Sequence, residues 1–178
     1  SSRRRHTRFR NVTGVQTCAL PILTIDWQIR RAELSDIDQL VEIEDAQFPE
    51  PWSRQLLRDE LSLTSQRRYT VAEQRGHVVG VLGLMLIDDD AHINTIATRP
   101  EYEGRGVARS LLDEALPVIR AEGYRRVTLE VAVGNQRARA LYLAYGFEPL
   151  GIRKQYYRVT NEDALVLVKY WQSDESAP

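Results

Sequence analysis

A glycine-rich turn in the second half of the sequence has the composition of an anion site. Glu103-Gly104-Arg105-Gly106-Val107-Ala108 joins a predicted strand to a segment with helical apolar spacing. A helix N-terminus exposes unpaired N–H groups and positive dipole, and glycine lets a phosphate approach the backbone closely. A Rossmann fingerprint would need a third glycine at Arg109, and the Gly-Lys-Ser/Thr of a P-loop is absent. Because such a turn is often only a turn, the pattern alone indicates a phosphate site weakly.

Two further residues could take part in proton transfer. Glu130 lies in a predicted strand whose Val127, Leu129 and Val131 share the opposite face, and glutamate is depleted in strands. Tyr142 lies on the apolar stripe of a short predicted helix. Taken singly, a solvent-facing glutamate and a core tyrosine are the more ordinary interpretations of these two residues.

The first half of the chain is expected to supply helices and strands that support the residues described above. Ser35 is the expected N-cap of a first helix, with Asp38 at the capping-box position. A proline-punctuated loop over 48–53 precedes a second helix. The alternation of apolar residues predicts strands at 27–30, 69–73, 78–87 and 91–98. The last three of these should form an antiparallel meander.

The second half of the sequence alternates predicted helices with predicted strands. Apolar residues recur at helical spacing from Val107 to Ile119, Pro117 should kink that helix near its end, and Gly123 should end it. A strand at 126–131 leads to a helix capped by Asn135 and ended by Gly146, and strands at 147–153 and 164–170 follow. The order β-α-α-β-β-β-α-β-α-β-β predicts an α/β (α+β) sandwich, in which helices cover a mixed, largely antiparallel sheet.

Residues 1–22 differ from everything after them. They carry five arginines and no acidic residue, which would suit a basic nucleic-acid-binding arm or a transit peptide. The segment from Val12 to Ile22 instead resembles the in-frame translation of a common short-read sequencing adapter. We therefore expect a non-native or disordered tail at 1–22, one domain at 23–172 and a flexible tail at 173–178.

Without residues 1–22 the remaining sequence has a more negative net charge. The whole chain has 24 Lys+Arg and 25 Asp+Glu, so removing five arginines leaves 19 basic against 25 acidic residues. An acidic domain disfavours nucleic acid as a ligand and suits a cationic substrate. The single cysteine, Cys18, lies in the excluded part, so neither a disulfide, a thiolate nucleophile nor a cysteine metal site is expected. No apolar run reaches the ~20 residues of a membrane span, and we expect a cytoplasmic protein.

Together these features resemble the GNAT acetyltransferases, and most of all the bacterial family that acetylates the N-terminal alanine of a small-subunit ribosomal protein. The similarity extends over nearly all of 23–171. It is carried by the stretch from Ile93 to Tyr102, the Gly104–Arg109 loop, Leu129-Glu130-Val131, Asn135, Ala140-Leu141-Tyr142, Gly146-Phe147, Arg153-Lys154-Gln155-Tyr156-Tyr157, and in the first half Phe48-Pro49 with Pro51-Trp52-Ser53.

The resemblance implies a role for each matching residue. The sheet should be splayed where acetyl-CoA, the co-substrate, binds without a metal. Glu130 would be the general base, acting through a water on the protein α-amine, and Tyr142 would protonate the departing thiolate. The residues implied to bind the cofactor are Ile96, Ala97, Thr98, Gly104, Arg105, Gly106, Val107, Ala108, Arg109 and Asn135. A backbone N–H near Ala97 would polarise the thioester carbonyl, and the aromatic residues of 48–52 and 156–157 would line the acceptor groove.

One residue departs from the family pattern. Glu103 stands where the superfamily usually has glutamine or arginine, and a carboxylate there would repel a phosphate, which Arg105 and Arg109 would have to offset. Two other functions stay open, namely acetylation of a small amine and a non-catalytic acyl-CoA-binding module. We expect a monomer or weak dimer with a protein N-terminus as its partner.

Overall fold

The computed structural model describes residues 27–171. The expectations for the tails at 1–22 and 173–178 therefore fall outside the described residues. The predicted order of elements is confirmed, with two added 3₁₀ turns at Leu34–Asp36 and Pro100–Tyr102. The strands are β1 (Gln28–Arg31), β2 (Arg67–Gln74), β3 (His77–Ile87), β4 (Asp90–Thr98), β5 (Arg126–Ala132), β6 (Glu148–Tyr157) and β7 (Glu162–Tyr170). The helices are α1 (Ile37–Gln47), α2 (Arg54–Ser62), α3 (Val107–Ala121) and α4 (Gln136–Ala144).

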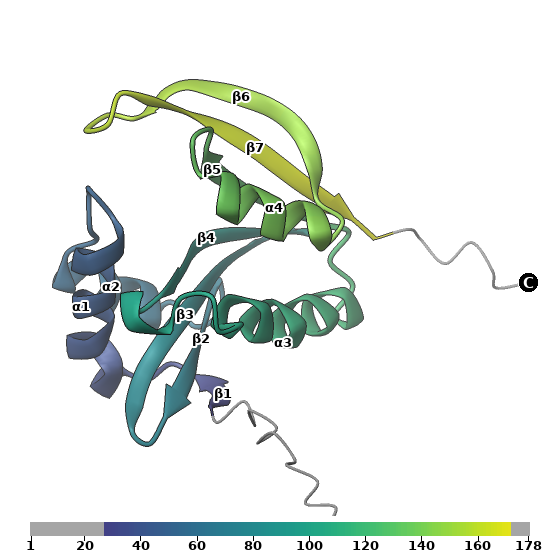
Figure 1. The fold of residues 1–178 in the computed structure, drawn as a ribbon. Helices are drawn as coiled ribbons and strands as arrows, with labels where there is room; N and C mark the ends of the chain where they lie inside the picture. Colours follow the sequence, from purple (N-terminus) through teal and green to yellow (C-terminus); the bar gives the residue numbers. More distant parts are fainter. Residues whose placement is uncertain (1–26, 172–178) are drawn as a thin grey trace, which may run out of the picture.

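One sheet contains all seven strands in the order β1-β2-β3-β4-β5-β7-β6. Its neighbouring strands are antiparallel except β4 and β5, which run parallel. That single parallel pair extends only from Asp90↔Arg126 to Ile93↔Leu129, although β4 continues to Thr98. The sheet therefore separates after Ile93 and Leu129, and Figure 1 shows its two halves diverging there. The predicted mixed and splayed sheet is confirmed.

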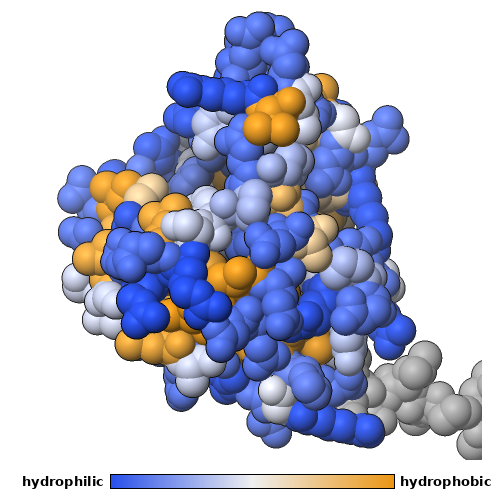
Figure 2. Space-filling view, turned by 90° about the vertical axis from the view of Figure 1, so that its left-hand side faces the viewer, coloured by the Kyte–Doolittle hydropathy of each residue, from blue (hydrophilic) through white to orange (hydrophobic). Residues whose placement is uncertain are grey.

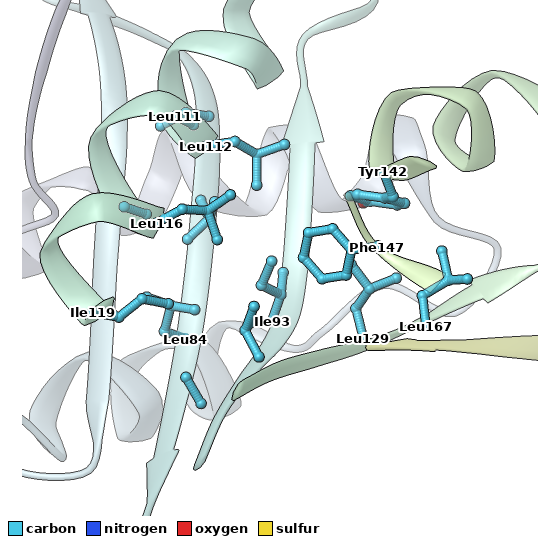
Figure 3. Packing of buried hydrophobic residues seen from close by; sticks show 14 of the residues in the cluster. Leu84, Ile93, Leu111, Leu112, Leu116, Ile119, Leu129, Tyr142, Phe147 and Leu167 are labelled. Atoms are coloured by element: carbon cyan, nitrogen blue, oxygen red, sulfur yellow. The ribbon is translucent and has the colours of Figure 1, made fainter. Parts of the chain in front are cut away.

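Helices cover both faces of the sheet. On one face, side chains of α1 and α2 pack on β2, β3 and the end of β4, with Leu40, Ile43 and Leu57 at the centre. On the other face, α3 and α4 enclose a larger core, which includes Leu111, Leu129, Tyr142 and Phe147. Figure 3 shows Tyr142 and Phe147 beside Leu129 and Leu167 in this core. The open part of the sheet can thus be reached from two opposite sides.

The predicted start of the first helix is wrong. Ser35 does not cap it; Glu33 and Asp36 form a capping box around the 3₁₀ turn that precedes α1. The Asp36 carboxylate accepts the N–H of Glu33 at 2.8 Å and both terminal nitrogens of Arg30 at 2.8 Å each. A carboxylate held by an arginine and a backbone donor is a stronger cap than a serine hydroxyl, so the turn begins before Ser35.

A close approach of α3 to the sheet fixes the position of the glycine-rich turn. A Cβ atom at Gly80 of β3 would lie 2.5 Å from Val107 Cγ1 and 3.1 Å from the Ala97 carbonyl oxygen. Only glycine leaves room for the first turn of α3 at that place. The helix N-terminus consequently sits against β3 and β4, next to the unpaired end of β4.

Candidate active site

The glycine-rich turn has the backbone that an anion cradle requires. Gly104 and Gly106 have φ of 74° and 95°, and Gly106 is the N-cap of α3, which begins at Val107. Space beside Gly106 is open, since nothing lies within 4 Å of an added Cβ. Ala108 and Arg109 complete the first turn, whose free N–H groups face outward from the helix end. The turn and the unpaired part of β4, with Ile96, Ala97 and Thr98, are thus neighbours in space, as well as in the sequence.

The unusual Glu103 is part of a polar bridge across this turn. Its Oε2 accepts from Arg137 Nη1 of α4 at 2.9 Å, and its Oε1 accepts from Gln47 Nε2 of α1 at 2.9 Å. Arg137 Nη2 also lies 3.2 Å from the place of a Gly104 Cβ. The acidic charge is therefore matched by a cation held above the turn. Arg105, in contrast, stacks on the Tyr102 ring at 5.2 Å.

We expect Arg137→Gln to weaken coenzyme A binding about fivefold, since an exposed charge contact contributes up to ~1 kcal/mol. The variant removes the cation above the turn and leaves the Glu103 carboxylate beside the phosphates. Calorimetric titration with coenzyme A would measure the loss, and pantetheine, which has no phosphate, should bind both proteins equally. An equal loss for pantetheine would contradict a role of Arg137 at the phosphates.

Asn135 caps α4 as predicted. Its Oδ1 accepts the N–H of Ala138 at 3.0 Å, which leaves its amide nitrogen for another partner. Tyr142, two turns further along α4, is 5% exposed and its ring meets Phe147 edge-on at 5.7 Å. Burial raises the pKa of the Tyr142 phenol well above its usual value, and Tyr157 adds to the shift. The phenol is therefore neutral and keeps its proton.

Glu130 lies one residue beyond the last β4–β5 pair, on the face opposite Leu129. Its side chain is 9% exposed, with Oε2 at 3.0 Å from His92 Nε2 and Oε1 at 3.0 Å from Arg153 Nη1. The His92 hydrogen bond lowers the pKa of Glu130 below its usual value, with help from Arg153 and against the effect of burial. Glu130 is thus a fixed carboxylate, which disagrees with the ordinary interpretation of a solvent-facing glutamate.

Tyr157 links the two candidate proton-transfer groups. It is half-buried on β6 and raises the pKa of Tyr142, while burial, and then Tyr156 and Glu130, raise its own pKa to about 12. Figure 3 shows Tyr142 beside Leu129, and Glu130 is the next residue of β5, on the opposite face. The structure therefore brings Glu130 and Tyr142 to the same part of the sheet, although they come from opposite faces.

The loop between α1 and α2 lies over the Glu130 side of this region. Val159 N–H, in the β6–β7 turn, donates to Glu50 Oε1 at 2.9 Å and joins the two segments. Buried Glu44 holds the same loop to the sheet, because its carboxylate accepts from Trp52 N at 3.2 Å and from Thr95 Oγ1 at 3.3 Å. Figure 2, seen from the side of α1 and α2, shows hydrophobic side chains between hydrophilic ones on this face. The loop and the hairpin, with exposed Tyr156, thus border one approach to Glu130.

Several residues of this site were not found from the sequence. His92 and Glu44 carry no motif, and the contact of Arg137 with Glu103 joins two segments 34 residues apart. Within residues 27–171 there is no group of three His, Cys, Asp or Glu residues that could hold a metal. No helix in that range is long and apolar enough to cross a membrane.

Comparisons with known proteins agree with this geometry. The acetyltransferase (GNAT) family profile matches residues 37–147. A putative [ribosomal protein bS18]-alanine N-acetyltransferase of Bacillus subtilis is 39% identical over 139 residues, which cover 78% of this chain and 92% of that protein. The N-alpha-acetyltransferase RimI of Mycobacterium tuberculosis is 33% identical over 139 residues, covering 75% and 85%.

The fold comparison points the same way. The crystal structure of the ribosomal-protein-S18-alanine N-acetyltransferase from Escherichia coli superimposes with a TM-score of 0.77 and 25% sequence identity, covering 85% of this chain and 99% of that one. The family profile spans more than half of the chain, and the segments that it includes run from α1 through the glycine-rich turn, Glu130 and Tyr142. The chain belongs to the acetyltransferase (GNAT) family.

Proposed function

We propose that this protein transfers the acetyl group of acetyl-CoA to the N-terminal α-amine of a protein, and that its acceptor is the N-terminal alanine of ribosomal protein bS18. The observation that supports this most is the placement of a fixed carboxylate and a neutral phenol on opposite faces of one opening in the sheet. A base and an acid on either side of a thioester are what amine acetylation needs. The names of the relatives supply the acceptor.

Acetyl-CoA, the co-substrate, suits the hydrogen-bonding groups that are unpaired around the opening of the sheet. The unpaired edge of β4 at Ile96, Ala97 and Thr98 offers backbone hydrogen bonds to the amides of the pantetheine arm, like an added strand. The Gly104–Gly106 cradle and the start of α3 suit the diphosphate, with Arg137 above it. The free amide nitrogen of Asn135 can donate to the arm. A backbone N–H near Ala97 would face the carbonyl oxygen of the thioester.

The chemistry assigned to the side chains is an exchange of protons. An α-amine has a reference pKa of ~8, so at neutral pH most of it is protonated and cannot attack. Glu130 is the general base that frees its lone pair. The amine then attacks the thioester carbonyl carbon, the carbon–sulfur bond breaks, and the Tyr142 hydroxyl supplies a proton to the thiolate. The approach bordered by 48–53 and the β6–β7 turn would admit the peptide from the Glu130 side.

The acceptor can be tested directly. Purified protein, acetyl-CoA and a synthetic peptide with the bS18 N-terminus should give a peptide heavier by one acetyl group, located by mass spectrometry on the α-amine. The same peptide with a blocked N-terminus, and internal lysines in it, should stay unmodified. Faster acetylation of polyamines or aminoglycosides would support a small-amine enzyme instead, and coenzyme A binding without any transfer would support a binding module.

A further inference from the structure

Strand β4 contains one extra residue at the place where the sheet opens. Its register with β3 includes the pair Leu84↔Ile93, and the next pair is Gly83↔Thr95, so Asn94 is the additional residue of a β-bulge. The pairing of β4 with β5 also ends at Ile93. The bulge therefore begins where β4 separates from β5.

The bulge changes the face of the sheet toward which the later residues of β4 point. Ile93 packs in the core that α3 and α4 enclose, near Leu129 (Figure 3). In a regular strand Thr95 would face the same core, because side chains alternate. Instead Thr95 Oγ1 donates to Glu44 of α1, and Ala97 packs in the core below α1 and α2. One extra residue likewise changes which backbone N–H groups of β4 point toward its open side.

A buried polar cluster holds the bulge in place. The Asn94 amide nitrogen donates to Glu60 Oε2 at 3.1 Å and to the Tyr69 hydroxyl at 3.0 Å. Tyr69 donates to the same Glu60 oxygen at 3.0 Å, and Arg67 Nε donates to it at 2.7 Å. Glu60 and Tyr69 are only 8% and 3% exposed. Both hydrogens of the Asn94 amide are thus used, and the charge of the carboxylate is matched by Arg67.

Strand β3 leaves room for this cluster because residue 83 is a glycine. A Cβ atom at Gly83 would lie 2.5 Å from Tyr69 Cε1 and 2.6 Å from Asn94 Oδ1. Gly83 is the register partner of Tyr69 on β2 and of Thr95 on β4. The Asn94 side chain therefore lies across bare backbone, and the bulge is held by α2 through Glu60, by β2 through Tyr69 and by β3 through Gly83.

We infer that Asn94 is a positioning residue, which Glu60 and Tyr69 hold so that the bulge directs the backbone N–H groups near Ala97 toward the carbonyl oxygen of the thioester. This inference rests on the proposed function and deepens it, because it names the side chains that orient the oxyanion donor. Such donors are effective when they are oriented before the reaction begins, and a fully hydrogen-bonded buried cluster is rigid. Asn94 acts through the backbone of β4 and not on the reacting atoms.

The first test is Asn94→Asp. Aspartate has the shape of asparagine, but its carboxylate has no N–H donors and repels the Glu60 carboxylate, so the bulge loses its support. We expect kcat for the peptide to fall about tenfold, part of the ~10²–10³ that the loss of a whole oxyanion donor costs. The KM for acetyl-CoA should change little, because the Gly104–Gly106 cradle still binds the diphosphate.

Reversing the hydrogen bonds should restore the cluster. In the double variant Asn94→Asp with Glu60→Gln, the glutamine amide donates to the aspartate, so the cluster again contains one carboxylate and a donor that faces it. We expect this variant to recover most of the kcat that Asn94→Asp loses. A wild-type kcat for Asn94→Asp, or a folded double variant that is no better than it, would overturn the inference.

A control separates positioning from stability. Val78 lies at the start of β3, away from the bulge, and is fully buried. Val78→Ala leaves a small cavity and should lower the melting temperature, with kcat preserved in the folded protein. If Val78→Ala lost as much kcat as Asn94→Asp, the loss in the latter would follow from stability, and the positioning role would fail.

A spectroscopic readout needs no acceptor. The carbon-13 NMR resonance of acetyl-CoA labelled at its carbonyl carbon should move downfield when it binds the wild-type protein, because a hydrogen bond polarises the carbonyl group. The bound resonance should move less in Asn94→Asp and as in the wild type in Val78→Ala. A wild-type resonance at the position of free acetyl-CoA, or an equal displacement in Asn94→Asp, would contradict the role of Asn94. If the wild-type protein acetylates no peptide, the proposed function fails, and this comparison still decides whether Asn94 orients the donor.

Discussion

Glu130→Gln is expected to lower the turnover number roughly a hundredfold or more, within the ~10²–10⁴ range of general base catalysis. Glutamine has nearly the same shape and can still accept a hydrogen bond from His92 or Arg153. It carries no negative charge, so it cannot draw the proton from the ammonium. Steady-state kinetics with acetyl-CoA and the bS18 N-terminal peptide would measure the loss, and the coenzyme A affinity should hardly change.

A matched control and the pH make this result specific. Glu114→Gln is the same chemical change on the exposed face of α3 and should leave turnover unchanged. Raising the pH above ~8 deprotonates the acceptor amine, so the deficit of Glu130→Gln should become smaller there. A turnover near the wild-type value, or a deficit that is the same at every pH, would be incompatible with Glu130 as the base.

The lowered pKa of Glu130 also has a consequence for stability. A carboxyl group whose pKa is lower in the folded than in the unfolded protein stabilises the fold above the unfolded-state value of ~4.3. That contribution is lost as the pH falls through the lower, folded-state pKa. Glu130 is therefore fully ionised across the neutral range, and the pH dependence of activity near neutrality must come from other groups.

The sequence was sufficient for the order of elements because each element carries its own local signals. Asn135 before the stripe of α4 and Gly146 after it predict the helix, and the structure has that cap and a φ of 80° at Gly146. At α1 the local signal misleads, since the Asp36 cap depends on Arg30 from the preceding strand. The C-terminal end of β6 was also underestimated, at Arg153 instead of Tyr157, because its ten residues are almost all exposed and lack alternation.

The candidate site was predictable only where a motif is contiguous. The glycine turn and Asn135 can be seen in a short stretch of sequence, and Glu130 and Tyr142 gained meaning from the family resemblance. The His92–Glu130 contact depends on the register of two parallel strands, which are joined by the long crossover 99–125. Register across such a crossover follows from the packing of α3 on the sheet, which no local pattern encodes. The partners of Glu103 were hidden for the same reason.

Tyr142→Phe is expected to lower turnover about ten- to hundredfold and to leave coenzyme A binding and thermal stability nearly intact. A hydrogen bond to a charged atom contributes ~1.5–3 kcal/mol, which corresponds to this range of rates. In the described part of the chain the pKa of Tyr142 is shifted by burial and Tyr157, with no hydrogen bond among the causes. Removing the hydroxyl therefore leaves the contact with Phe147 in place and deprives only the thiolate of its donor.

Tyr145, three residues further on, provides the opposite case on the same helix end. Its hydroxyl donates to Asp113 Oδ1 at 2.7 Å and lies 3.2 Å from the Arg109 carbonyl oxygen, tying α4 to α3. Tyr145→Phe should thus lower the melting temperature by a few degrees, about 1 kcal/mol, with turnover preserved in the folded protein. If Tyr142→Phe instead showed that pattern, its hydroxyl would be structural. The leaving thiolate would then depart without an enzymatic acid, and Glu130 would be the remaining proton-transfer group.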